Sequence, residues 1–145
     1  MTFKLTDNYA SFFNILPKDW QDGIVPFWED YKETTKCYLL FDGNEIVAGG
    51  LVFSKCSIDM LYCENEANKW FVNGYLYIGF IYVIEARRQQ NLGSIWLDSL
   101  KKVHPNQKYW LTIEDSKLDA FYVKNGFKRV KSLFHDGVEE VVYSY

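Results

Sequence analysis

Residues 75–100 read YLYIGFIYVIEARRQQNLGSIWLDSL, and this stretch decides the fold. Its first ten residues, Tyr75–Ile84, form an apolar run rich in β-branched and aromatic side chains. Such a run predicts a strand buried on both faces at the centre of a sheet. From Leu92 to Val103 apolar residues recur every three or four positions, which predicts an amphipathic helix. A buried strand followed directly by a helix indicates a mixed α/β sheet.

The segments on either side of this stretch extend the same pattern. Two β-rich runs around Asp42-Gly43 predict a tight hairpin. A second helix is expected over residues 117–125, because Gly126 follows it as a left-handed stop. The remaining expected elements are short helices at residues 9–15 and 26–32, a strand or an excursion within residues 54–73, and strands at residues 109–113, 127–133 and 138–145.

Composition bounds the class of protein. With 145 residues and 48% hydrophobic residues, we expect one domain over residues 1–145. The 16 basic and 19 acidic side chains argue against a general nucleic-acid binder. No apolar stretch is long enough for a membrane helix, and the N-terminus lacks the apolar region of a signal peptide, so a soluble, cytoplasmic protein without a membrane partner is expected. Three cysteines without a C-x-x-C pair and two distant histidines predict no metal site.

The segment between the predicted strand and the predicted helix is polar and basic. A helix that begins directly after a buried strand presents free N–H groups, which form an anion site. Arg87 and Arg88 add positive charge, and residues 87–108 hold five basic side chains against one acidic. A phosphorylated ligand is therefore expected here, with a solvated loop and an ordinary charged helix face as the alternative. The glycine-rich motifs of mononucleotide and dinucleotide sites are absent.

These residues, in this order, resemble the GNAT superfamily of acyl-CoA-dependent N-acyltransferases. The family motif is [QR]-x-x-G-x-[GA] between a central strand and a helix, and residues 88–93 (RQQNLG) fit it at the first and last positions. Asn91 replaces the first glycine, and asparagine is the residue that next best tolerates left-handed backbone. AFYVKNGF, residues 120–127, resembles the family's helix that carries a tyrosine and ends in Gly-Phe.

The resemblance implies a central twisted mixed β-sheet flanked by helices, with acetyl-CoA as the donor. It places the pyrophosphate on backbone N–H groups of the loop and of the first helical turn. It also implies that the pantetheine arm pairs with the edge of the central strand. The residues that would bind the cofactor are then Arg88, Gln89, Gln90, Asn91, Leu92, Gly93 and Ser94 at the pyrophosphate, and Tyr82, Val83 and Ile84 along the strand.

The resemblance also implies catalytic residues. Tyr122 stands where family members often carry a tyrosine that protonates the departing CoA thiolate. The alternative is that its ring only packs the helix on the sheet. Glu114, after residues 109–113, is the best single candidate for a general base and Glu85 a weaker one. Either glutamate could instead be a solvated surface acid, because a water chain can carry the proton.

The expected function is transfer of an acetyl group from acetyl-CoA to a primary amine of a small-molecule or peptide acceptor by direct attack. The alternative is a catalytically silent CoA-binding sensor or interaction module of the same fold. Residues 1–35 hold three basic and six acidic side chains, which predicts a positively charged or amine-bearing acceptor. The sequence leaves the oligomeric state open, with a homodimer as one option.

Overall fold

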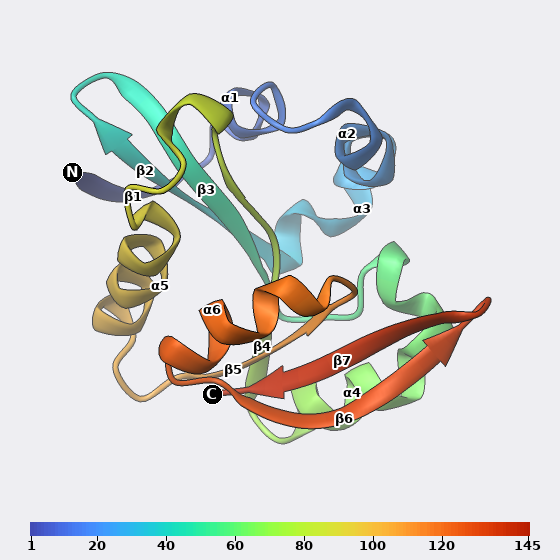
Figure 1. Cartoon of the computed structure of the whole chain (residues 1–145). Coiled ribbons are helices and arrows are strands. Elements are labelled where there is room, and N and C mark those ends of the chain that lie inside the picture. Colours follow the sequence, from blue (N-terminus) through green and yellow to red (C-terminus); the bar gives the residue numbers. More distant parts are fainter.

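A seven-stranded mixed sheet forms the centre of the computed structural model, which describes all 145 residues (Figure 1). The strand order is β1-β2-β3-β4-β5-β7-β6, and only β4 and β5 are parallel neighbours. This sheet confirms the predicted fold class. The strands are β1 (Thr2–Thr6), β2 (Thr35–Asp42), β3 (Glu45–Phe53), β4 (Tyr75–Val83), β5 (Lys108–Ile113), β6 (Lys128–His135) and β7 (Val138–Ser144).

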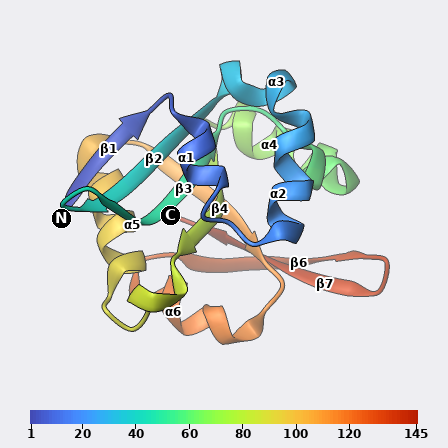
Figure 2. The ribbon, with the colours of Figure 1, turned by 90° about the horizontal axis from the view of Figure 1, so that it is seen from above.

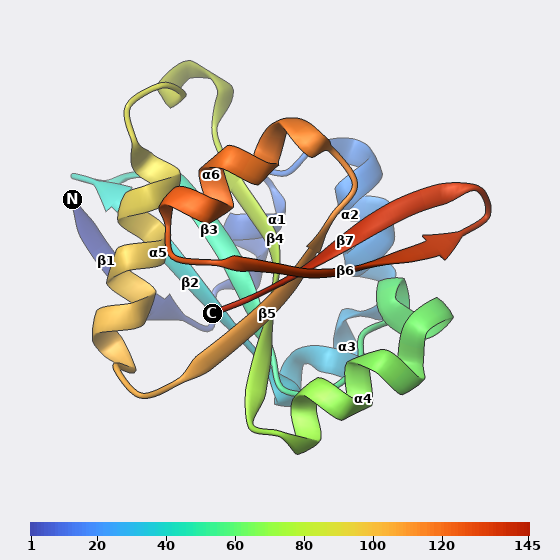
Figure 3. The same cartoon turned by 60° about the horizontal axis from the view of Figure 1, so that its bottom comes forward.

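Helices cover both faces of the sheet, with α5 and α6 in front of the strands in Figure 3 and α1 to α3 behind them. None of them is long and apolar enough to cross a membrane. The α-helices are α1 (Tyr9–Phe13), α2 (Lys18–Ile24), α3 (Trp28–Tyr31), α4 (Glu64–Val72), α5 (Leu92–Val103) and α6 (Asp119–Lys124). Short 3₁₀ turns are η1 (Val25–Phe27), η2 (Lys32–Thr34), η3 (Ile58–Cys63), η4 (Glu85–Arg87) and η5 (Ser116–Leu118).

Several predicted elements need adjustment. The hairpin turn lies at Gly43-Asn44, one residue later than predicted, because Asp42 still pairs with Glu45 and Gly43 takes the positive φ of 61°. Residues 58–72 form a helical excursion and contain no strand. Strand β1 and helix α2 have no counterpart among the predicted elements. Gly126, with φ of 89°, ends α6 in the predicted left-handed conformation.

Strand β4 lies at the centre of the sheet as predicted, but it is not buried along its whole length. Only Tyr77 and Ile78 are fully buried. Strand β5 pairs with β4 over residues 75–77 alone, and Phe80, with φ of 57°, lies where the register between β3 and β4 shifts. Figure 2 shows β1–β3 on one side of β4 and the hairpin of β6 and β7 extending to the other. One edge of β4 therefore faces an opening beyond Tyr77.

The position of α5 on the sheet depends on close contact between Gly50 and Trp96. The indole of Trp96 is fully buried and donates a hydrogen bond to the carbonyl of Tyr38 at 3.0 Å. A Cβ at Gly50 would lie 2.6 Å from the same ring. Its neighbour Gly49 faces Phe12 of α1 in the same way, at 2.5 Å. The glycine pair therefore lets α1 and α5 approach β3 from opposite faces.

We expect Gly50→Val to lower the free energy of unfolding by about 1–3 kcal/mol, because the added methyl groups overpack the buried Trp96 ring. Gly23→Ala in α2 is the matched control, since no atom lies within 4 Å of its added Cβ. The control should be neutral or stabilising by about 0.5–1 kcal/mol, as expected for a helical glycine. Urea unfolding of the three proteins measures both effects. Equal stability of Gly50→Val and the parent would contradict the close approach of α5.

Candidate active site

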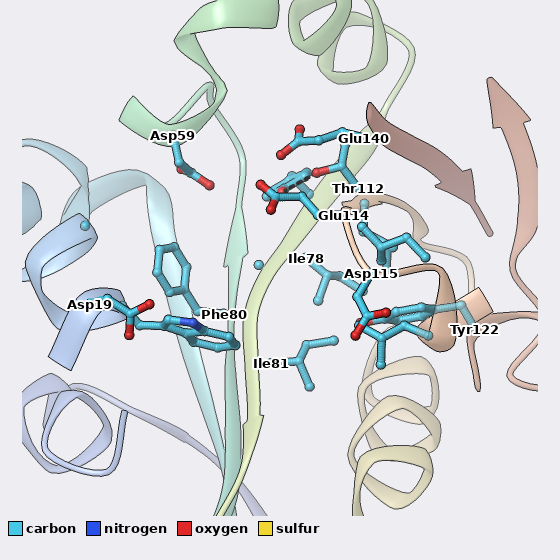
Figure 4. A pocket seen from close by; sticks show the side chains of 17 residues that line it. Asp19, Asp59, Ile78, Phe80, Ile81, Thr112, Glu114, Asp115, Tyr122 and Glu140 are labelled. Carbon is cyan, nitrogen blue, oxygen red and sulfur yellow. Dashed lines mark hydrogen bonds between the residues drawn. The ribbon is translucent and has the colours of Figure 1, made fainter. Parts of the chain in front are cut away.

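Two cavities meet where β4 and β5 separate. The large cavity, of about 570 Å³, lies between β4, β5 and the elements α2 and η3 (Figure 4). The loop cavity, of about 440 Å³, lies between the end of β4, the segment after it and α6. Ile81, Leu118 and Tyr122 line both. A ligand that spans the two cavities would therefore pass Tyr122.

The segment before α5 exposes an uninterrupted set of backbone donors. No protein acceptor bonds the N–H groups of residues 89–94, whereas the N–H of Arg88 is bonded to the carbonyl of Glu85. Gln89 and Asn91 adopt left-handed conformations, with φ of 64° and 63°. Asparagine thus replaces the motif glycine without changing the backbone conformation expected of that position. Donors that converge at the first turn of a twelve-residue helix form an anion site.

The positive charge at this loop comes from Arg88 rather than from both arginines. Arg87 is held in ion pairs with Asp42 at 2.7 Å and Glu45 at 2.8 Å, so its charge is neutralised by the β2–β3 hairpin. Arg87 also lines the loop cavity, but its two ion pairs compensate the charge that it was expected to add there. Arg88 has no carboxylate partner, donates to the carbonyl of Val83 at 3.2 Å and stacks over a tyrosine ring. Its charge stays free for an anion.

The exposed edge of β4 presents a different set of residues from the predicted one. The N–H of Ile84 bonds to Val47 of β3, and Tyr82 pairs with Gly49. Because hydrogen bonding alternates along an antiparallel strand, Val83 directs its backbone groups away from β3. Ile81 and Val83 line the loop cavity, whereas Tyr82 and Ile84 do not. Of the three predicted strand residues, only Val83 lines the loop cavity, and Ile81 lines it as well.

Tyr122 combines a packed ring with a free hydroxyl. Its side chain is only 8% exposed, and the ring packs against Phe121, Phe127 and Tyr143. The hydroxyl makes no hydrogen bond with the protein, and burial raises its pKa to about 12. Tyr122 therefore remains protonated at neutral pH. The packing alternative holds for the ring, while the hydroxyl at the junction of the two cavities is free to donate.

Helix α6 is tied to the first turn of α5 by one buried side chain. The amide of Asn125 donates to the hydroxyl of Ser94 at 3.0 Å and to the carbonyl of Phe121 at 2.8 Å. Ser94 belongs to the set of free backbone donors, and Phe121 precedes Tyr122. Asn125 therefore fixes the position of Tyr122 relative to the anion site at residues 89–94.

Comparison with known proteins agrees with this geometry. A family model described as the acetyltransferase (GNAT) family matches residues 5–127. The chain belongs to this family. None of the curated proteins matches it in sequence. The membership confirms the resemblance seen in the sequence and covers the loop, α5 and α6.

Solved structures of other proteins share the fold. An aminoglycoside 6'-N-acetyltransferase complexed with coenzyme A matches with a TM-score of 0.73 and 13% identity, over 100% of this chain and 96% of that one. The smu.2055 protein of Streptococcus mutans matches with a TM-score of 0.61 and 21% identity, over 100% of this chain and 98% of that one. A GNAT acetyltransferase from Elizabethkingia anophelis with acetyl-CoA bound matches with a TM-score of 0.60 and 15% identity, over 99% of this chain and 95% of that one.

The candidate bases of this GNAT protein differ in position. Glu114 follows β5 and lines the large cavity at an exposed position. Glu85 lies in η4 and lines neither cavity. Asp59 of η3 and Glu140 of β7 also line the large cavity, although sequence analysis did not single them out. No motif marks either residue, since only the folded chain brings them next to Glu114.

The three cysteines are not activated nucleophiles. Burial raises the pKa of the Cys37 thiol to about 12 and those of Cys56 and Cys63 to about 11. Since the thiolate is the reactive form, all three are inert at neutral pH. A covalent acyl-cysteine route thus has no suitable residue in this GNAT protein.

The left-handed loop gives a test of the anion site. Asn91→Val should weaken CoA binding about tenfold, because a β-branched residue in left-handed backbone costs about 1–2 kcal/mol and shifts the free N–H groups. Asn91→Gly restores the family residue and should bind CoA at least as well as the parent. Calorimetric titration with CoA measures both affinities. Unchanged binding by Asn91→Val would show that the phosphates lie elsewhere.

Proposed function

We propose that this GNAT protein transfers an acetyl group from acetyl-CoA to a primary amine of a small-molecule or peptide acceptor by direct attack. The observation that carries the proposal is the junction of the two cavities at Tyr122. One cavity offers free backbone donors and a cation, as a pyrophosphate requires. The other is lined by carboxylates, as an amine requires.

The residues around the loop cavity fit CoA. The N–H groups of residues 89–94 would bind the pyrophosphate, with the guanidinium of Arg88 beside them. The backbone of Ile81 and Val83 at the edge of β4 would bind the amides of the pantetheine arm, in the manner of an added strand. The carbonyl of Val83 already accepts a hydrogen bond from Arg88, so the N–H of Val83 is the group left for this role. When bound, acetyl-CoA supplies an acetyl group activated as a thioester.

The chain's own residues would then take part in two proton transfers, one from the amine and one to the departing sulfur. The amine nitrogen forms a bond to the acetyl carbon as the bond from that carbon to sulfur breaks. An amide and the CoA thiol result. The amine proton would be lost to Glu114, directly or through water, because this carboxylate lines the large cavity. Tyr122 would donate its hydroxyl proton to the departing sulfur, so that the thiolate leaves as the CoA thiol, and solvent would return a proton to the tyrosine.

The silent-module alternative loses part of its support. It depended on Asn91 in place of glycine and on the lack of a base, and Asn91 adopts the left-handed conformation that the loop requires. Assays of thiol release from acetyl-CoA, run against a panel of primary amines, separate the two functions. A rise in melting temperature with CoA but no thiol release with any amine would favour the silent module.

Substitution of Tyr122 separates its two roles. Tyr122→Phe keeps the packed ring, so CoA affinity and stability should stay close to those of the parent. Loss of the hydroxyl should lower kcat about tenfold or more, as expected for a general acid. Tyr122→Ala should also lower the free energy of unfolding by about 3 kcal/mol or more, through a cavity under α6. Full turnover by Tyr122→Phe, measured where chemistry limits the rate, would leave solvent as the proton donor.

A further inference from the structure

The large cavity has an acidic wall with no basic side chain in its lining. Its carboxylates come from separate parts of the chain: α2, η3, the segment after β5, and β7. In Figure 4 Asp59, Glu114 and Glu140 lie on one side of the view and Tyr122 on another. The members of this acidic wall are Asp19, Asp59, Glu114, Asp115 and Glu140.

The acidic wall is not neutralised by the protein. None of its carboxylates takes part in an ion pair, although carboxylates elsewhere do, as Glu66 does with Lys131 at 2.6 Å. Asp59 accepts a hydrogen bond from the hydroxyl of Ser57. Desolvation raises the pKa of both Asp59 and Glu140, and the charge of Asp59 raises the pKa of Glu140 further. Two neighbouring carboxylates are therefore held without a cation.

Other groups in the same cavity also indicate a ligand. Tyr122 lines this cavity, is more than nine-tenths buried, and has a hydroxyl without a hydrogen-bond partner in the protein. The aromatic rings of Trp20 and Phe80 form a T-shaped pair with centroids 6.0 Å apart, and both residues line the large cavity. Aromatic faces attract organic ammonium groups. No cluster of acidic, histidine or cysteine side chains in the protein is arranged to hold a metal ion. Separated carboxylates beside aromatic rings fit an organic cation better.

We infer that the acceptor is a diamine or polyamine, whose second ammonium group binds to Asp59 and Glu140 while the reacting amine lies near Tyr122 and Glu114. This inference rests on the proposed function and adds the class of acceptor to it. A single amine at the reacting position would leave Asp59 and Glu140 without a counter-charge. A second ammonium group supplies that charge between the exposed Asp59 and the half-buried Glu140, as a charge-assisted hydrogen bond to each carboxylate.

The test compares diamines with amino alcohols of the same chain length, for example 1,5-diaminopentane with 5-aminopentan-1-ol. The two differ in one charge, so their ratio of kcat/KM isolates the second ammonium group. Over chains of three to eight carbons we expect the preferred diamine to exceed its amino alcohol by about tenfold or more, mainly through KM. Equal kcat/KM for the two acceptors in the parent protein would overturn the inference.

The variants Asp59→Asn and Glu140→Gln keep the size of each side chain and remove its charge. Each should lower kcat/KM for the diamine about tenfold and leave that for the amino alcohol within about twofold. Glu139→Gln is the matched control, because Glu139 is exposed on the same strand and lines neither cavity. The control should keep the parent's preference. Equal losses for both acceptors in the Asp59 and Glu140 variants would overturn the inference.

Calorimetry distinguishes this inference from the proposed function. Diamine binding is titrated with CoA present, and thermal unfolding confirms that each variant is folded. If no amine releases thiol, the proposed function fails, yet diamine binding that weakens in Asp59→Asn and Glu140→Gln but not in Glu139→Gln still supports the dication site. If thiol is released but diamine and amino alcohol bind equally, the proposed function stands and the inference fails.

Discussion

The site depends on the short parallel contact between β4 and β5. Parallel pairing lasts for residues 75–77 only, and after Tyr77 the two strands separate. Everything described at the site follows from that separation. The free edge of β4, the junction at Tyr122 and the large cavity all lie where β5 no longer pairs with β4. The left-handed Phe80 lies in the same part of β4, where the register with β3 shifts. The opening is thus built into the sheet and needs no movement of a loop.

Local chemistry made part of this structure predictable. The apolar run of β4, the polar segment after it and the periodic helix α5 form one continuous stretch, so its elements and its anion site could be inferred from neighbouring residues. Asn91 is the clearest example, because the tolerance of asparagine for left-handed backbone is a property of the residue itself. Gly126 ended α6 for the same kind of reason.

Distant contacts made the rest unpredictable. Arg87 looked like a free charge until the fold brought Asp42 and Glu45 to it, more than forty positions away. Asp59 and Glu140 meet only because η3 and β7 border the same cavity. The orientation of Val83 depends on which neighbour β4 pairs with and on the irregular residue at position 80. Strand β1 carries mostly exposed side chains, so its short run gave no alternating pattern.

The acidic wall has a thermodynamic consequence for the ligand-free protein. Asp59 and Glu140 have pKa values raised above their ordinary range, so the folded chain holds protons at these positions more tightly than the unfolded chain. By linkage, their contribution to stability grows as pH falls from neutrality through the folded-state pKa values. Most carboxylates in proteins have a lowered pKa in the folded state, so their contribution to stability is lost as pH falls. A dication bound as inferred above would favour the charged carboxylates and so offset the unfavourable contribution of Asp59 and Glu140 at neutral pH.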